Sequence, residues 1–372
     1  MSTLLFVDRV IERIFPRKIL VPSLGVKVRD AEQQIIELTK KQRKILGFVR
    51  AQQRVCIEGA AGTGKTVLAF EKARQLAEDG VETLLLCFNE LLAERLRYQA
   101  RNVPNITVFT FHELCIHFAT QASIDANHER QGISDNDYFD KTLPDLLLQA
   151  IDSLPNQRFG AVIVDESQDF DSQWWLHVEA LLSHHDGTLW IFKDTAQNLY
   201  SREPGLPSHM EVFTLEENVR NTRRIHDASK PFAKGDSGFC TGPEGPQVRY
   251  ELATTASAVR TVVSKLLHEL ITVEGLRRED VILLTGRTVS KSALGGHNKV
   301  GAFDLKRFGG EGNGVEVDSI WRFKGLERPV VIITDMPTFV KNSVRYVAIT
   351  RARSALVVVG DHDELIAAGL QQ

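Results

Sequence analysis

The stretch GAAGTGKT, residues 59–66, decides how the rest of the chain is interpreted. It fits the pattern G-x-x-x-x-G-K-[S/T] in full, and it lies between an apolar run at 54–59 and a helical pattern at 66–76. Glycines in such a loop let backbone N–H groups turn inward around a phosphate, and the helix N-terminus adds a favourable dipole. We therefore predict a phosphate-binding loop in which Lys65 reaches the β/γ-phosphates and Thr66 ligates Mg²⁺. The predicted loop residues are Gly59, Ala60, Ala61, Gly62, Thr63, Gly64, Lys65 and Thr66.

An acidic pair follows another apolar run. AVIVDESQD (161–169) places Asp165 at the C-terminal end of a predicted strand, where ligands bind in open parallel sheets. We expect Asp165 to hold Mg²⁺ through water and Glu166 to polarise an attacking water. In this order after a phosphate loop, the pair indicates nucleotide hydrolysis rather than binding alone. Hydrolysis also needs positive charge near the transferred phosphoryl group, and Arg220 and Arg351 are the candidates.

Apolar runs alternate with helical patterns along most of the chain. Strands that alternate with helices imply parallel sheets built from right-handed crossovers. We therefore predict an α/β fold of two parallel-sheet domains with the phosphate loop in the cleft between them. The expected strands are 54–59, 83–88, 106–111, 161–166, 188–193, 248–252, 281–285, 315–320, 330–334 and 355–360.

The remaining segments set the domain boundaries. We assign residues 1–37 to a lead-in segment, 38–214 to the first domain and 215–372 to the second. Residues 122–140 are polar and weakly patterned, which is typical of a small surface insertion. Residues 229–247 are rich in Gly and Pro, which suits a long loop or linker.

Composition narrows the class of protein. The chain has 372 residues, 43% of them hydrophobic and 25% charged, which is ordinary for a globular protein with two cores. We expect no membrane span and no signal peptide. The cysteines match neither a zinc pattern nor a disulfide framework, so we expect a cytoplasmic protein. The net charge of −3 argues against a general basic coat for nucleic acid but leaves room for a local groove.

The motifs, taken in order, resemble the superfamily 1 helicases of the UvrD/Rep type. The resemblance covers roughly residues 38–360. It implies two RecA-like domains, ATP and Mg²⁺ as cofactors, and single-stranded or tailed duplex DNA as the partner. Compact helicase modules that often follow a nuclease-related domain are the most similar. The motifs are GAAGTGKT, CFNELLAERL (87–96), TFHEL (110–114), VDESQDF (164–170), KDTAQNLY (193–200), LEENVRNT (215–222), SIWRFKGLE (319–327) and YVAITRAR (346–353).

The resemblance implies a role for each matching residue at the nucleotide. Gln42 matches the glutamine that reads the adenine, and Gln197 matches the one that senses the γ-phosphate and couples it to DNA. Arg220 and Arg351 match two arginine fingers that reach across the cleft from the second domain. Glu327 matches the acid that contacts the ribose.

Further residues lie where the family lines its single-strand groove, and each has a structural alternative. Phe88 and Tyr200 fit a stacking platform equally well as a core position. Trp321 stands where the family usually carries histidine, so it either stacks on a base or sugar or only packs on the protein. The predicted DNA-contacting residues are Phe88, Asn89, Thr110, His112, Tyr200 and Trp321.

The sequence departs from the family pattern in three places. Val219 replaces a tyrosine that stacks on the adenine, and Lys193 replaces a glycine. The large helical inserts of longer members are missing. One hypothesis is therefore an ATP-driven DNA translocase or helicase with 3′-to-5′ movement. The alternative is an ATP-gated nucleic-acid sensor or regulatory subunit that docks on a nuclease or another protein in a repair or defence complex.

Overall fold

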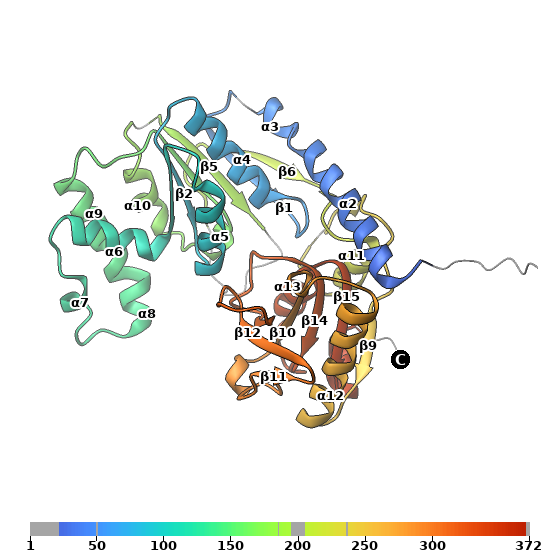
Figure 1. Ribbon diagram of the computed structural model, residues 1–372. Helices are drawn as coiled ribbons and strands as arrows, with labels where there is room; N and C mark the ends of the chain where they lie inside the picture. Colours follow the sequence, from blue (N-terminus) through green and yellow to red (C-terminus); the bar gives the residue numbers. More distant parts are fainter. Residues whose placement is uncertain (1–21, 50, 185, 195–204, 236, 370–372) are drawn as a thin grey trace, which may run out of the picture.

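The computed structural model describes residues 22–369, apart from residues 50, 185, 195–204 and 236. Two sheets, each flanked by helices, form two domains that lie one above the other in Figure 1. The predicted α/β architecture of two parallel-sheet domains is confirmed. No described helix combines the length and the apolar character that a membrane span requires.

The first sheet has the order β3-β2-β4-β5-β1-β6, and all its strands are parallel. Five of its strands lie where the apolar runs predict them. The sixth, β6, has only its last residue buried and therefore lacks the apolar signature of a strand. The strands are β1 (Arg54–Gly59), β2 (Thr83–Cys87), β3 (Ile106–Thr110), β4 (Ala161–Val164), β5 (Thr188–Lys193) and β6 (Glu211–Leu215).

Helices cover both faces of this sheet and bury alternate strand residues. Helices α4 and α5 share a core with Val55, Leu85 and Ile163. Helices α6, α9 and α10 pack on Cys56 and Leu84, which point to the opposite face. Burial on both faces explains why these strands read as continuous apolar runs. The helices are α4 (Lys65–Glu78), α5 (Glu90–Ala100), α6 (Phe111–Gln121), α9 (Leu143–Ser153) and α10 (Trp174–Ala180).

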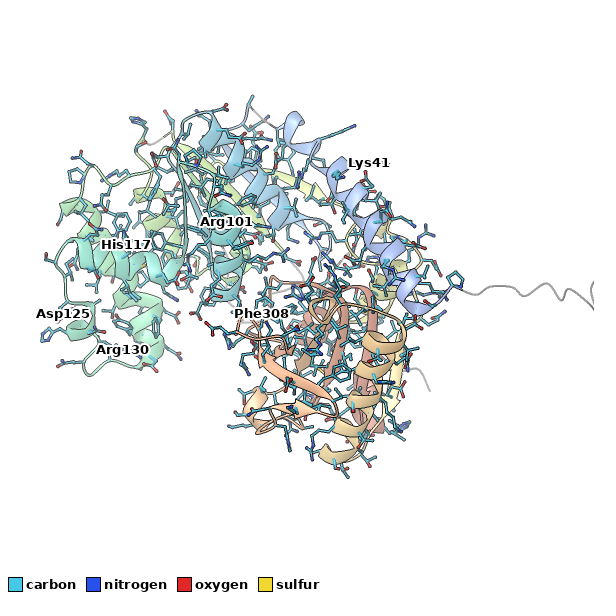
Figure 2. The ribbon with its side chains drawn as sticks, viewed as in Figure 1. Lys41, Arg101, His117, Asp125, Arg130 and Phe308 are labelled. Atoms are coloured by element: carbon cyan, nitrogen blue, oxygen red, sulfur yellow. The ribbon has the colours of Figure 1, made fainter. Side chains whose placement is uncertain are left out.

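The predicted insertion at 122–140 is a compact helical projection. It contains α7 (Ala126–Glu129), α8 (Asp135–Asp137) and the start of a π-helical turn, Tyr138–Thr142. The Tyr138 hydroxyl donates to the Ala126 carbonyl at 3.0 Å and ties the projection together. Figure 2 shows Asp125 and Arg130 at its outer tip, on the side of the first domain away from helix α2. Trp174 is buried at its base and donates through Nε1 to the Asp140 carbonyl at 3.0 Å.

The second sheet has the order β11-β12-β13-β10-β14-β15-β9. Its pairings are parallel except for the β11–β12 hairpin. Its strands are β9 (Arg249–Leu252), β10 (Val281–Thr285), β11 (Lys299–Val300), β12 (Phe303–Arg307), β13 (Val315–Ser319), β14 (Arg328–Thr334) and β15 (Ala352–Gly360). Its helices are α11 (Arg223–Ser229), α12 (Ala256–Leu267), α13 (Asn342–Thr350) and α14 (His362–Ala367), and a short pair, β7 (Glu217–Asn218) and β8 (Phe239–Cys240), lies beside it.

Helix α2 (Leu24–Gln42) runs between the two domains, followed by α3 (Ile45–Phe48). Its N-terminal end is fastened to the second domain, because the Gly25 N–H donates to Glu274 Oε2 at 2.8 Å and Glu32 pairs with Arg353. Its last residue, Gln42, is buried beside the phosphate loop. The described part of the predicted lead-in, residues 22–37, therefore belongs mostly to a helix that contacts both domains.

Candidate active site in the cleft between the domains

The phosphate loop connects β1 to the first turn of α4, as the sequence predicts. Gly62 and Gly64 have φ values of 79° and 81°, a left-handed conformation that favours glycine. A Cβ at Gly64 would lie 2.4 Å from Gln42 Oε1, so a larger residue would also displace the Gln42 side chain. The loop therefore has the backbone geometry that turns N–H groups toward a bound phosphate.

Lys65 is buried at the base of the loop. Its ammonium donates to the carbonyls of Gly59 at 2.7 Å and Ala60 at 2.8 Å, and to Asp194 Oδ2 at 3.0 Å. Asp194 follows β5 and is completely buried, so it is the counter-ion that stabilises the lysine inside the protein. This arrangement holds the cation at the position where it can reach a phosphate.

Asp165 follows the end of β4, and its carboxylate is buried with few hydrogen bonds to the protein. Neither of its oxygens makes a well-formed hydrogen bond within the described part of the chain. Burial and the neighbouring Glu166 raise its pKa to about 7, although the Thr66 hydroxyl and Lys65 act in the opposite direction. A buried carboxylate with free acceptor oxygens next to a threonine hydroxyl fits a hard divalent cation such as Mg²⁺.

The donor set also limits which metal the site can hold. Among the described residues, no three or more His, Cys, Asp or Glu side chains are grouped to hold a metal. Mg²⁺ commonly uses one or two protein oxygens together with substrate phosphates and water, so Thr66 and Asp165 suffice for it.

Glu166 has a left-handed backbone conformation, with φ 54° and ψ 39°, which is uncommon for a residue with a side chain. Gln168 bonds to its carboxylate through Nε2 and accepts from the Asp194 backbone N–H at 2.9 Å through Oε1. Gln168 thereby connects the ends of β4 and β5 and orients the predicted general base. Sequence reasoning missed Gln168, although it lies inside the VDESQDF motif.

Gln42, predicted to read the adenine, is buried beside the phosphate loop. Its Nε2 donates to the Glu217 carbonyl at 3.2 Å. Its Oε1 is buried without a hydrogen-bond partner among the described residues. An unpaired buried acceptor beside the phosphate loop is available to a base amino group.

The two predicted arginine fingers reach the phosphate loop from the second domain. Arg220 and Arg351 line one pocket together with Lys65, Thr66 and Glu166. The Arg220 guanidinium pairs with Glu327 Oε2 at 2.6 Å, whereas Arg351 donates to backbone carbonyls, including that of Leu326 at 3.1 Å. The structure therefore places four of the residues predicted for hydrolysis, Lys65, Glu166, Arg220 and Arg351, around one cavity.

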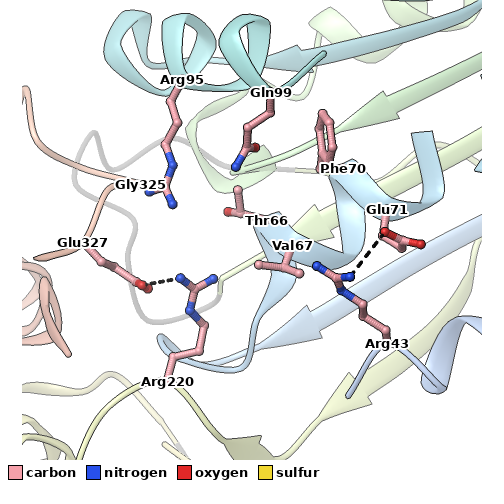
Figure 3. A pocket seen from close by; sticks show the side chains of 10 residues that line it. All are labelled: Arg43, Thr66, Val67, Phe70, Glu71, Arg95, Gln99, Arg220, Gly325 and Glu327. Carbon is pink, nitrogen blue, oxygen red and sulfur yellow. Dashed lines mark ion pairs between the residues drawn. The ribbon is translucent and has the colours of Figure 1, made fainter. Parts of the chain in front are cut away.

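Burial alone would raise the pKa of Glu327, but the charges of four arginines outweigh it and hold that pKa below its ordinary value. In order of decreasing effect, these are Arg220, Arg353, Arg351 and Arg95. Glu327 is therefore ionised at neutral pH and lies at the centre of a cationic cluster. Figure 3 shows it facing Arg220 across the cleft from Thr66 and Val67.

Two cross-domain contacts were not predicted from the sequence. The buried Lys324 pairs with the buried Asp169, with its ammonium 2.7 Å from Oδ2. The Tyr346 hydroxyl accepts from the Ala61 N–H in the phosphate loop at 2.9 Å. In the sequence, the signal for the first contact was an acid next to Phe170 and a lysine next to Phe323, each inside a motif.

The structure shows the contacts of the two residues that depart from the family pattern, Val219 and Lys193. Val219 is buried against the loop, and its N–H donates to the Gly62 carbonyl at 3.1 Å, so it fills space rather than stacking on a base. Lys193 pairs with Glu58 across neighbouring parallel strands at 3.3 Å.

Four of the residues predicted to contact DNA in the first domain lie in its described part, and each has a partner within the protein. Asn89 caps α5 and donates to the Arg322 carbonyl at 3.1 Å. Thr110 caps α6 in a capping box with Glu113. His112 Nε2 lies 3.0 Å from the Phe139 carbonyl oxygen, and Phe88 stacks on Trp174 with centroids 6.2 Å apart. Their contact with DNA stays a prediction.

Trp321 is half-buried and packs against an apolar cluster that includes Leu326. Its predicted contact with a single strand also stays untested by the geometry. Gln197 and Tyr200 lie outside the described residues.

Comparison with known proteins adds a family match for the first half of the chain. Residues 25–187 match the model described as Type III restriction enzyme, res subunit. The matched segment contains the phosphate loop and the Asp165–Glu166 pair but covers less than half of the chain. No curated protein matches the chain. The family match points to an ATP-hydrolysing enzyme of the helicase type.

Solved structures similar to this chain include viral helicases. An arterivirus nonstructural protein 10 helicase in complex with DNA has 14% identity and a TM-score of 0.42, covering 92% of this chain and 67% of that one. The PRRSV helicase has 14% identity and a TM-score of 0.41, covering 82% and 52%. A further structure of arterivirus nonstructural protein 10 has 14% identity and a TM-score of 0.37, covering 87% and 62%. The chain thus spans between about half and two thirds of the length of these helicases.

Proposed function

We propose that the chain is an ATP-dependent translocase or helicase of the UvrD/Rep type, acting on single-stranded or tailed duplex DNA. One observation carries the proposal. A single pocket is lined by two arginines of the second domain together with the phosphate loop and Glu166 of the first domain. A site that only binds nucleotide has no need of arginines from a second domain beside a buried general base, whereas hydrolysis does.

The residues of the cleft divide the work of hydrolysis. Lys65 and the loop N–H groups hold the β- and γ-phosphates, and Thr66 and Asp165 hold Mg²⁺. When bound, Mg²⁺ neutralises charge on the phosphates. Glu166 orients and deprotonates the attacking water. Arg220 and Arg351 stabilise the charge on the transferred phosphoryl group, a contribution of about 10³–10⁵ in rate.

The same division couples hydrolysis to movement. ATP contacts the first domain through the loop and the second through the arginines, so its binding favours closure of the cleft. Loss of the γ-phosphate removes the contact that the arginines need, and the domains can separate again. Alternate closing and opening would advance the protein along a single strand. The 3′-to-5′ direction and the preference for DNA follow from the resemblance to the UvrD/Rep family.

The test is an ATPase assay with and without single-stranded DNA, run on the wild type and on Lys65→Ala and Glu166→Gln. We expect strong stimulation by DNA and loss of turnover in both variants. Strand displacement on 3′-tailed and 5′-tailed duplexes then gives the direction. Stimulation without displacement would identify a translocase that does not unwind. An ATPase rate that does not change when DNA is added would remove the main support for a DNA translocase.

A nuclease or another protein subunit is a further proposed partner, suggested by the lead-in segment. Residues 22–37 lie mostly in α2, whose Val28, Ala31 and Ile35 are buried inside this protein. Residues 1–21, outside the described part, are therefore the segment to delete in a pull-down. Unchanged association after the deletion would exclude that segment as the docking site.

A further inference from the structure

Arg95 is a charged residue in the cleft that lies within the motif CFNELLAERL (87–96) and has been given no role there. It extends from α5 of the first domain into a pocket whose lining includes Thr66, Arg220 and Glu327 (Figure 3). It is half-buried, and burial followed by the charge of Arg220 lowers its pKa to about 10. No hydrogen bond or ion pair joins its guanidinium to any residue in the described part of the chain. A partly buried cation without a partner among the described residues is free to pair with an anion that moves toward it.

Glu327 is the residue whose partner must change during the proposed reaction. In this structure its carboxylate pairs with Arg220 at 2.6 Å, and both side chains are largely buried. To stabilise the transferred phosphoryl group, Arg220 has to turn from Glu327 toward the nucleotide. A buried carboxylate that loses its only ion-pair partner is strongly destabilised, so this movement is unfavourable unless another cation replaces Arg220.

The other arginines near Glu327 already have partners. Arg351 donates to the carbonyls of Val347 and Leu326. Arg353 pairs with Glu32 of helix α2. Of the four arginines that lower the pKa of Glu327, only Arg95 has neither an ion pair nor a hydrogen bond within the described residues. It also lines the same pocket as Glu327, whereas Arg353 does not.

We propose that Arg95 is a positioning residue that becomes the ion-pair partner of Glu327 when Arg220 moves to the phosphate. Arg95 belongs to the first domain and Glu327 to the second, so the exchange adds a contact between the domains only in the ATP-bound state. It also keeps Glu327 in place while Arg220 is away from it. The inference rests on the proposed ATP hydrolysis and on the role of Arg220 in it.

A double-mutant cycle tests the exchange. We expect Arg95→Ala to lower the kcat of DNA-stimulated ATP hydrolysis by about tenfold, the size of coupling expected for interacting buried groups. The affinity for ADP should change little, because Arg95 does not line the pocket formed by Lys65 and the loop glycines. Arg95→Lys should recover part of the rate. In a Glu327→Gln background the same Arg95→Ala change should have almost no effect, because an amide needs no counter-ion.

Controls separate this role from a structural one. Arg101→Ala removes an exposed arginine just beyond α5 that donates to the Tyr98 carbonyl and lies over the Tyr98 ring, and its kcat should equal that of the wild type. Arg95→Ala should not lower the thermal unfolding midpoint of the protein measured without nucleotide, because Arg95 has no ion pair or hydrogen bond to lose among the described residues. If that variant does not fold, Arg95→Lys and its cycle with Glu327→Gln carry the test.

The results that would overturn the inference are distinct. If the wild type hydrolyses ATP and Arg95→Ala has an unchanged kcat, the exchange of ion-pair partners is excluded, while the proposed ATP hydrolysis stands. Weaker ADP binding in Arg95→Ala, together with an equal loss in the Glu327→Gln background, would make Arg95 a direct nucleotide contact. A wild type without ATPase activity would contradict the proposed function as well.

Discussion

The proposed nucleotide site and the proposed single-strand groove differ in whether their polar side chains have hydrogen-bond partners. At the nucleotide end, buried groups lack partners within the described residues, including Gln42 Oε1 and both carboxylate oxygens of Asp165. At the proposed single-strand groove, Asn89, Thr110 and His112 each bond to another part of the protein. Unpaired buried polar groups are costly, so they indicate where a ligand completes the structure. Groups that already hold a helix or a loop do not give that indication.

The contrast shows what kind of evidence each end supplies. The nucleotide end holds buried acceptor atoms that are available to the ATP and Mg²⁺ of the proposed function. The groove residues serve the fold first, so a role in DNA binding must be shown by measurement. Substitutions at four positions test whether the two regions differ in this way.

The largest effect is expected from Arg220→Ala. Loss of an arginine that stabilises the transferred phosphoryl group should reduce kcat by about 10³-fold or more. Binding of ADP should weaken far less, because the γ-phosphate is absent from it. Arg220→Lys should recover only part of the rate, since an ammonium lacks the planar fork of a guanidinium. A tenfold loss or less would show that Arg220 does not act on the transition state.

The cross-domain pair of Lys324 and Asp169 should come next. Both side chains are almost completely buried, so Lys324→Ala leaves a carboxylate without its cation and should cost about 3–5 kcal/mol of stability. Urea unfolding measures this loss. Replacing both residues together, as Lys324→Met with Asp169→Leu, should recover most of it. Lys40→Ala, which removes an exposed pair with Glu37, is the matched control and should change little. If Lys324→Ala and Lys40→Ala lost the same amount of stability, burial would not be what makes the Lys324–Asp169 pair important.

Trp321→Ala addresses the groove itself. If Trp321 stacks on a base, the change should weaken single-strand binding by about 1–3 kcal/mol and leave ATP binding nearly unchanged. Fluorescence anisotropy with labelled DNA and a fluorescent nucleotide gives the two affinities. Trp321→Phe keeps an aromatic face and should retain much of the DNA affinity. Equal losses for DNA and ATP would show that Trp321 only packs on the protein.

The smallest effect concerns the pH dependence of stability in protein freed of divalent cations. The pKa of Asp165 is raised from 3.8 to about 7, so its contribution to stability is complete below about pH 4 and is lost as the pH rises through 7. Asp165→Asn removes the buried charge. Its gain in stability over the wild type should be larger at pH 8 than at pH 5, by about 1 kcal/mol or more. A gain that does not depend on pH would show that Asp165 is not protonated in the folded state.

Sequence patterns predicted the strands well where both faces are buried. The runs at β1, β5 and β10 matched the observed boundaries, because a strand covered on both sides is apolar throughout. The edge strand β6 and the short hairpin of β11 and β12 were missed, since partly exposed strands carry no such run. Helix α2 was missed because Val28, Ala31 and Ile35, which follow a helical spacing, are separated by many polar residues.

The sequence by itself determined the parallel α/β class, the phosphate loop and the order of the residues predicted for hydrolysis. Those features are local, since they depend on apolar runs and on spacing within one strand, turn and helix. Only the tertiary structure decided which distant side chains share the cleft: Lys324 with Asp169, Tyr346 with Ala61, and Arg95 opposite Glu327. Such pairs join residues that are far apart in the chain. Their partners are set by how the two sheets face each other, which no local pattern records.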